Sequence, residues 1–156
     1  AERRRAREVV ITLILATDMK EHAKAIFELE HALDKAEADG SSYDACQEQN
    51  HLPVLKVLMH LSDVSNPAKP FRTYERWTEL VMEEFYAQAE IEEEKDIPHT
   101  MPRRGGCELG RFQLGFIGFI RPLFAAAGRV EGVDMSAPLG HLDATARVWH
   151  DRAENS

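Results

Sequence analysis

The sequence predicts an all-α fold. Apolar residues recur every three or four positions through several long segments, which is the spacing of one face of a helix. No segment alternates apolar and polar residues convincingly with the two-residue period of a β-strand. Prolines and glycines gather in residues 97–106, between two of the helical patterns. We therefore expect a chain of helices joined by polar loops.

The composition limits the class of protein. The 156 residues are 44% hydrophobic and 29% charged, which fits one globular domain or part of a larger one. The net charge of -8 argues against binding along a nucleic-acid backbone. No apolar run approaches the roughly 20 residues of a membrane span, and no signal peptide is visible at the charged N-terminus. Cys46 and Cys107 lie far apart without metal-ligand spacing, so we expect free thiols and a cytoplasmic location.

The pattern of apolar residues predicts two helices in the first half of the chain. Residues 2–36 contain no proline or glycine, and one apolar stripe runs along them, with a kink allowed near Thr17 and Asp18. The stripe consists of Val9, Val10, Leu13, Ile14, Thr17, Ala23, Ile26, Phe27, Leu29 and Leu33. Residues 37–50 predict a polar loop, and residues 52–63 predict a second helix.

The second half predicts three more helices, over residues 71–95, 108–127 and 139–152. On the first of these, the expected buried stripe is Tyr74, Trp77, Val81 and Phe85, and the acidic residues 90–96 form a solvated face. The second helix is apolar on nearly every side, so we expect it to be buried all round. The last helix packs through Leu142, Val148 and Trp149, and residues 97–106 and 129–138 form loops.

Asp63 is unusual because an acid stands where a helical pattern ends. Pro67 cannot join the hydrogen-bond ladder of a helix and biases Asn66 away from helical angles, which puts Asp63 in the last turn. The helix dipole disfavours a carboxylate there by roughly 0.3–1 kcal/mol. A cation should therefore face Asp63, either a basic side chain such as Lys69 or a metal ion.

Gln113 is unusual because an amide lies inside the most apolar segment. Burying a side-chain amide without partners costs about 1–3 kcal/mol. The amide is either satisfied by a neighbouring tyrosine, histidine or backbone group, or it faces a pocket. In a pocket it would suit the polar edge of a planar heterocycle, and Phe116, on the same helix face, could stack on that ring.

With these residues in view, the chain resembles the C-terminal half of the catalytic domain of the class I cyclic nucleotide phosphodiesterases. The matching stretches, in chain order, are Ile14 to Met19, Asp63 to Pro70, Trp77 to Phe85 and Gln113 to Ile117, followed by Pro122-Leu123 and Trp149. They cover almost the whole chain. A histidine at position 60, three residues before Asp63, resembles the pattern of the cAMP-type branch of the family.

The resemblance implies an HD-type all-helical fold in which residues 1–156 form the C-terminal part of a single catalytic domain. It implies two divalent ions, Zn²⁺ and Mg²⁺ or Mn²⁺, and a hydroxide between them that opens cAMP or cGMP to the 5′-monophosphate. Asp63 would be the metal ligand from this half. Gln113 would read the purine edge, with Phe116 and Val81 clamping the base. The same pocket would be lined by Asn66 and Met101. The resemblance also allows a homodimer through the full-length protein.

The chain departs from the family pattern at three places. The family's remaining metal ligands and general-acid histidine belong in motifs upstream of residue 1, so no catalytic residue is assigned here and the isolated chain is expected to be inactive. The pocket loop reads Met101-Pro102-Arg103-Arg104 where the family usually has Met-x-Asp-Arg, and Ala89-Glu90 replaces Gly-Asp. Asp18 lies in a matching motif without an assigned role.

Two alternatives to the enzyme stay open. One is a truncated, non-catalytic helical module that binds a nucleotide or a protein and exposes the face that the other half normally covers. The other is a different metal-dependent phosphohydrolase of the His-Asp class, which the pair Gln113 and Phe116 disfavours.

Overall fold

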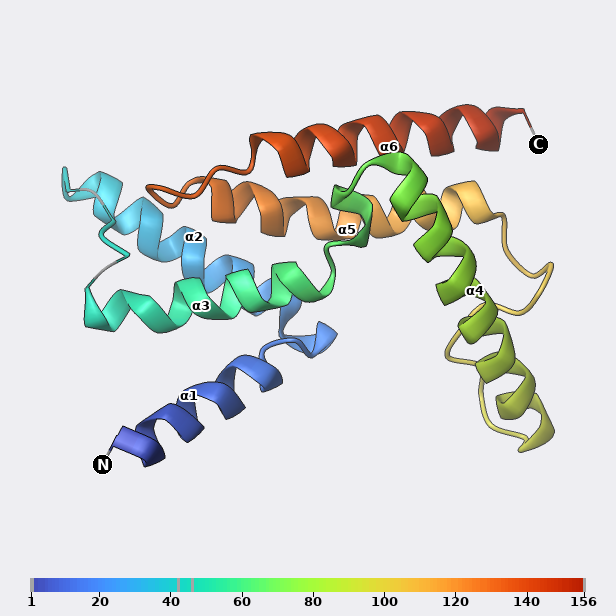
Figure 1. Ribbon diagram of the computed structural model, residues 1–156, viewed down its shortest axis with the longest axis horizontal. Coiled ribbons are helices and arrows are strands. Elements are labelled where there is room, and N and C mark those ends of the chain that lie inside the picture. Colours follow the sequence, from blue (N-terminus) through green and yellow to red (C-terminus); the bar gives the residue numbers. More distant parts are fainter. Residues whose placement is uncertain (1, 42, 46, 156) are drawn as a thin grey trace. The chain divides into compact units, whose positions relative to one another are not determined.

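The chain forms helices and connecting loops (Figure 1). The computed structural model describes residues 2–41, 43–45 and 47–155, without the side chains of residues 48 and 49. In chain order, the elements of this part are α1 (Glu2–Leu15), η1 (Met19–Glu21), α2 (His22–Ala38), α3 (Glu48–Asp63), η2 (Asn66–Ala68), α4 (Phe71–Glu94), α5 (Leu109–Gly128) and α6 (Ser136–Glu154). The described residues contain no β-strand, which confirms the predicted all-α class. None of these helices is long and apolar enough to span a bilayer.

The chain divides into two compact units. Unit 1 comprises residues 1–65 and 120–139, and unit 2 comprises residues 66–119 and 140–156. Helices α5 and α6 therefore contribute residues to both units. Each unit has its own buried side chains, and the predicted site residues divide between them.

In unit 1, the prediction of one helix over residues 2–36 was wrong. Helix α1 ends at Leu15, and a new start follows at Asp18, whose backbone is extended and whose side chain accepts a hydrogen bond from the backbone N–H of Lys20 at 3.0 Å. A short acid that bonds the backbone two residues ahead competes with continuous helix. The break falls where the sequence allowed a kink.

The break also divides the predicted apolar stripe. Helix α2 packs against α3 and buries Ala25, Leu29 and Leu33, whereas α1 buries no residue. Val10 and Ile14 of α1 are more than half exposed, at 54% and 57%. Since the chain turns between α1 and α2, the two stretches do not continue one face.

In unit 2, the buried face of α4 differs from the predicted stripe. Tyr74 is buried as expected, but Thr78 and Met82 continue the buried line, and Trp77 is 47% exposed. The ring of Trp149 on α6 packs edge-on against Tyr74, with centroids 6.5 Å apart, so this side of α4 faces α6. The acidic run at the end of α4 is not wholly solvated either, because Glu92 is buried.

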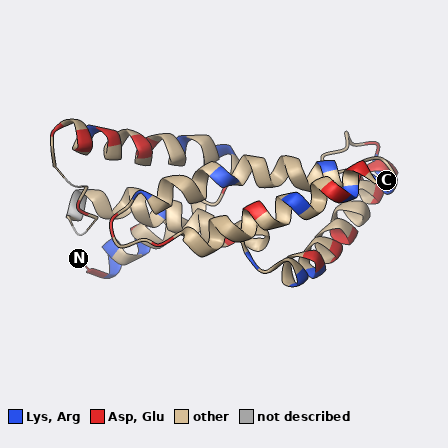
Figure 2. Ribbon diagram, turned by 90° about the horizontal axis from the view of Figure 1, so that it is seen from above, with Lys and Arg blue, Asp and Glu red and all other residues tan. Residues whose placement is uncertain are grey.

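Helix α5 carries only two charged residues, Arg111 and Arg121, and is drawn mostly in tan (Figure 2). The prediction that it is buried all round was wrong. Ile117 and Ile120 are buried, but Phe119 is 46% exposed and Phe116 is half-buried. An apolar helix can keep one side open, and sequence pattern alone does not say what covers that side.

The loop boundaries differ by a few residues from those predicted. Helix α3 begins at Glu48 and contains Pro53, and α6 begins at Ser136. The backbone N–H of Ser136 donates to Asp134 at 2.8 Å, which fixes the start of α6.

Candidate functional site

Asp63 lies where the sequence placed it, as the last residue of α3. Val64 caps the helix, and its backbone N–H donates the last i→i−4 hydrogen bond, to the carbonyl of His60 at 3.1 Å. The Asp63 side chain is exposed. An exposed carboxylate at the negative end of a helix is accessible to a cation.

A buried pair of histidines lies one turn before Asp63. Nδ1 of His22 and Nε2 of His60 are 2.8 Å apart, and the two side chains are 3% and 0% exposed. Burial lowers the pKa of His60, the charge of His22 lowers it further, and the charge of Asp63 opposes both effects. The pair joins the start of α2 to the end of α3. The sequence analysis missed it, because His22 and His60 are 38 positions apart and only the fold brings them together.

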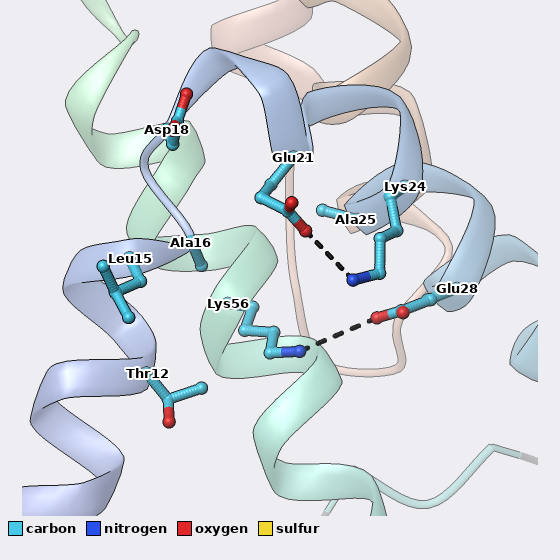
Figure 3. Close-up of a pocket in the computed structure, with 9 residues that line it drawn as sticks. All are labelled: Thr12, Leu15, Ala16, Asp18, Glu21, Lys24, Ala25, Glu28 and Lys56. Carbon is cyan, nitrogen blue, oxygen red and sulfur yellow. Dashed lines mark hydrogen bonds and ion pairs between the residues drawn. The ribbon is translucent and has the colours of Figure 1, made fainter.

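Asp18, which had no assigned role, borders a cavity of about 370 Å³ in unit 1 (Figure 3). The lining residues are Thr12, Leu15, Ala16, Asp18, Glu21, Lys24, Ala25, Glu28 and Lys56. Two ion pairs neutralise much of its charge, Lys24 with Glu21 at 3.1 Å and Lys56 with Glu28 at 3.7 Å. Across the described part of the chain, no three His, Cys, Asp or Glu side chains are grouped so that they could hold a metal ion.

Gln113 is buried in unit 2, and its amide has a partner. The hydroxyl of Tyr74 donates to Oε1 of Gln113, with Tyr74 2% and Gln113 6% exposed. Burial raises the pKa of Tyr74 to about 12, so the hydroxyl keeps its proton and stays a donor. The neighbouring tyrosine that the sequence analysis considered is therefore present, and it fixes the side-chain amide of Gln113.

The other predicted pocket residues of unit 2 lie on or beside two contacting helices. Helices α4 and α5 meet through Tyr74 and Gln113, and again where the rings of Phe85 and Phe112 pack edge to face at 6.4 Å. Val81 lies on α4 between these two contacts and is half-buried. Phe116, also half-buried, lies one turn along α5 from Gln113.

The remaining two predicted residues lie outside the long helices. Met101 is half-buried in the loop between α4 and α5, and Asn66 is half-buried at the start of η2. Gln113 is thus buried between α4 and α5, and the four other predicted pocket residues are half-buried within the same unit.

The family model described as 3′5′-cyclic nucleotide phosphodiesterase matches residues 1–139. The chain belongs to this family of cyclic nucleotide phosphodiesterases. Family membership implies a general dependence on divalent metal ions.

Two relatives illustrate the similarity in sequence. The chain is 32% identical over 152 residues to the probable 3′,5′-cyclic-AMP phosphodiesterase pde-4 of Caenorhabditis elegans, covering 96% of this chain and 22% of that protein. It is 33% identical over 121 residues to a 3′,5′-cyclic-AMP phosphodiesterase of Drosophila melanogaster, isoform F, covering 76% of this chain and 18% of that protein. The chain thus spans about a fifth of the length of these curated relatives.

Solved structures show the same fold. The phosphodiesterase domain of the Salpingoeca rosetta rhodopsin phosphodiesterase superposes with a TM-score of 0.84 at 31% identity, covering 99% of this chain and 46% of that one. The structure of LmjPDEB1 in complex with IBMX gives a TM-score of 0.84 at 27% identity, covering 96% of this chain and 44% of that one. The chain therefore corresponds to somewhat less than half of each solved chain.

Proposed function

We propose that this chain is the C-terminal part of a catalytic domain that hydrolyses 3′,5′-cyclic nucleotides to 5′-monophosphates. The match to the phosphodiesterase family over residues 1–139 is the observation that carries the proposal. The names of the Caenorhabditis and Drosophila relatives favour cAMP as a substrate. A cytoplasmic location and a homodimer of the full-length protein belong to the same proposal.

In this proposal, unit 2 binds the purine. Gln113 offers both a donor and an acceptor to the polar edge of the base, and the Tyr74 hydroxyl restricts how that amide can rotate. Val81 and Phe116 would cover the two faces of the ring, and Asn66 and Met101 would border the pocket. The partial exposure of these four side chains supports the proposal, because it leaves part of their surface open to a ligand.

Unit 1 supplies Asp63 as one ligand of a shared metal site. Its exposed carboxylate fits this role, but a single carboxylate does not hold an ion, and the described residues offer no further cluster. Two divalent ions, Zn²⁺ and Mg²⁺ or Mn²⁺, would stabilise the charge that develops on the phosphate when it is attacked. The other ligands and the general-acid histidine would come from the N-terminal half of the domain.

The test is hydrolysis of cAMP and cGMP by the full-length gene product and by residues 1–156 alone, each with and without divalent ions. We expect the full-length protein to be active only with metal and the 156 residues to be inactive. Turnover by the isolated chain, or none by the full-length protein with metal, would contradict the proposal.

One observation fits the alternative of a non-catalytic binding module as well as it fits the enzyme. The side chains of Val10, Ile11, Ile14 and Leu15 on α1 are each 45% or more exposed, which leaves an apolar surface available to a partner. The reading frame upstream of codon 1 discriminates between the enzyme and the non-catalytic module. Motifs there that carry the family's remaining metal ligands and general-acid histidine would support the enzyme, and an unrelated sequence would support the module.

A further inference from the structure

The loop between α4 and α5 is fastened to α4 on both sides of Met101. Thr100, immediately before Met101, bonds to Glu92 in the last turn of α4. Arg104, three residues after Met101, bonds to Glu83 two to three turns earlier on α4. All of these residues belong to unit 2, so this arrangement stands within one compact unit.

The anchor at Glu92 is the buried one. Glu92 is only 9% exposed. Its Oε2 accepts the backbone N–H of Thr100 at 2.8 Å, and its Oε1 accepts the hydroxyl of Thr100 and the amide N–H of Gln88, the latter at 2.9 Å. The amide of Gln88 also bonds to the Thr100 hydroxyl at 2.9 Å, which closes the network.

An acid at this position is unfavourable without these donors. It lies at the negative end of the α4 dipole, and removing a carboxylate from water is costly unless it is hydrogen-bonded. The bonds from Gln88 and Thr100 lower the pKa of Glu92 to about 2, so the carboxylate is ionised and accepts all three bonds at neutral pH. The loop thus supplies part of what stabilises Glu92, and Glu92 in turn fixes the loop.

The second anchor is weaker. Both terminal nitrogens of Arg104 donate to Glu83, at 2.9 and 2.7 Å, and the guanidinium lies 4.7 Å from the centroid of the Tyr86 ring. Both charged side chains are more than half exposed, and exposed ion pairs contribute little to stability. The position of Met101 therefore depends mainly on Thr100 and Glu92.

We propose that Glu92 is a positioning residue for the nucleotide pocket: through Thr100 it holds Met101 at the border of the purine site. This inference rests on the proposed function, because Met101 matters only if that pocket binds a nucleotide. Glu92 itself contacts no reacting atom. Its effect is on how well the base is bound, since a pocket wall that is held in place loses less conformational entropy when the ligand binds.

The test uses the full-length gene product with ¹³C-labelled methionine methyl groups, titrated with 5′-AMP. Residues 1–156 contain five methionines, so the Met101 methyl signal can be assigned by substitution. Glu92→Ala should shift the Met101 signal and weaken 5′-AMP binding about tenfold. Glu92→Gln keeps one acceptor and should have a smaller effect. Glu94→Ala removes an exposed acid from the same run and serves as the matched control.

The possible results separate the inference from the proposed function. If wild-type and Glu92→Ala chains bind 5′-AMP equally, or if Met101 shifts without a loss of affinity, the positioning role is wrong while the pocket stands. If the wild-type chain does not respond to 5′-AMP at all, the proposed pocket is contradicted and the role of Glu92 falls with it. An unchanged signal from Met82, which is buried on α4 in unit 2, shows that this unit of a variant is folded.

Discussion

Tyr74 is the residue that connects the three helices of unit 2. Its ring packs edge-on against Trp149 of α6, and its hydroxyl donates to Gln113 of α5, while the residue itself belongs to α4. A buried side chain that both packs and hydrogen-bonds specifies one arrangement of its neighbours more strongly than an apolar residue of similar size. The proposed purine-reading amide depends on this arrangement.

Tyr74→Phe should therefore destabilise the protein. The ring and its packing are kept, but the buried Oε1 of Gln113 loses its donor, which costs about 1–3 kcal/mol. Urea denaturation followed by circular dichroism measures the loss. Tyr86→Phe is the matched control, because it keeps the ring over which Arg104 lies. Equal stability of the two variants would show that the Tyr74 hydroxyl does not support Gln113.

His60 should make the stability of unit 1 depend on pH. Its pKa is lowered in the folded protein, so below the unfolded value of about 6.5 the unfolded chain binds more protons than the folded one. The contribution of neutral His60 is complete above that pH and is lost as the pH falls through it, by at most about 1.4 kcal/mol per pH unit for one proton.

Denaturation midpoints at pH 7.5 and 5.5 measure this dependence. His60→Gln should flatten the pH dependence, whereas His31→Gln, at an exposed histidine, should leave it as in the wild type. A wild-type slope that persists in the His60→Gln variant would assign the titration to other groups.

At the residue scale, the sequence predicted the positions of Asp63 and Gln113 because each breaks a local rule. An acid at the C-terminal end of a helix and an amide in an apolar helix are both visible in one dimension. The His22–His60 pair breaks no local rule, and Glu92 is one acid within a run that the sequence analysis assigned to a solvated face. The pair and the anchor at Glu92 exist because the fold brings distant residues together, so only the structure reveals them.

At the scale of elements, the ends of α2 and α4 use the same turn with different residues. At the end of α2, the N–H of Gly40 bonds to Glu37 and that of Ser41 to Ala36, with Gly40 at φ 67°. At the end of α4, the N–H of Asp96 bonds to Glu93 and that of Ile97 to Glu92, with Asp96 at φ 52°. This is the Schellman arrangement, whose left-handed position favours glycine.

Asp96→Gly should consequently stabilise the protein by about 0.5–1 kcal/mol, because glycine adopts this conformation without steric cost. The reciprocal change, Gly40→Asp, should destabilise it by a similar amount. Chemical denaturation of both variants provides the measurement. A loss of stability in Asp96→Gly would show that the Asp96 side chain makes a contact that outweighs the strain of its backbone.

The helices themselves were largely predictable, since the five helices predicted from periodicity cover all six α-helices of the described residues, with α1 and α2 merged into one, and turn residues located most boundaries within a few positions. The break after Leu15 was not predictable as the end of a helix. No proline or glycine marks it, and a single aspartate cap produces it. The buried side of α4 was also misplaced. Trp77 is more apolar than Thr78, but burial follows the neighbouring helix and not hydrophobicity alone.

At the scale of the whole molecule, the chain corresponds to 46% of the solved Salpingoeca rosetta domain. The apolar residues exposed on α1, and the single accessible acid at the end of α3, are what one part of a larger catalytic domain would present to the other. The central claim is therefore that Asp63 supplies a metal ligand to a site completed by the N-terminal half of the domain.

The most direct measurement is hydrolysis by a chimera in which residues 1–156 replace the matching part of the Salpingoeca rosetta phosphodiesterase domain. With divalent metal, the chimera should hydrolyse cyclic nucleotide, and Asp63→Ala should reduce its rate at least about 100-fold with loss of bound metal. Asp39→Ala, at the acid that ends α2, should leave the rate unchanged. An active chimera whose rate and metal content survive Asp63→Ala would contradict the assignment of Asp63 as a metal ligand.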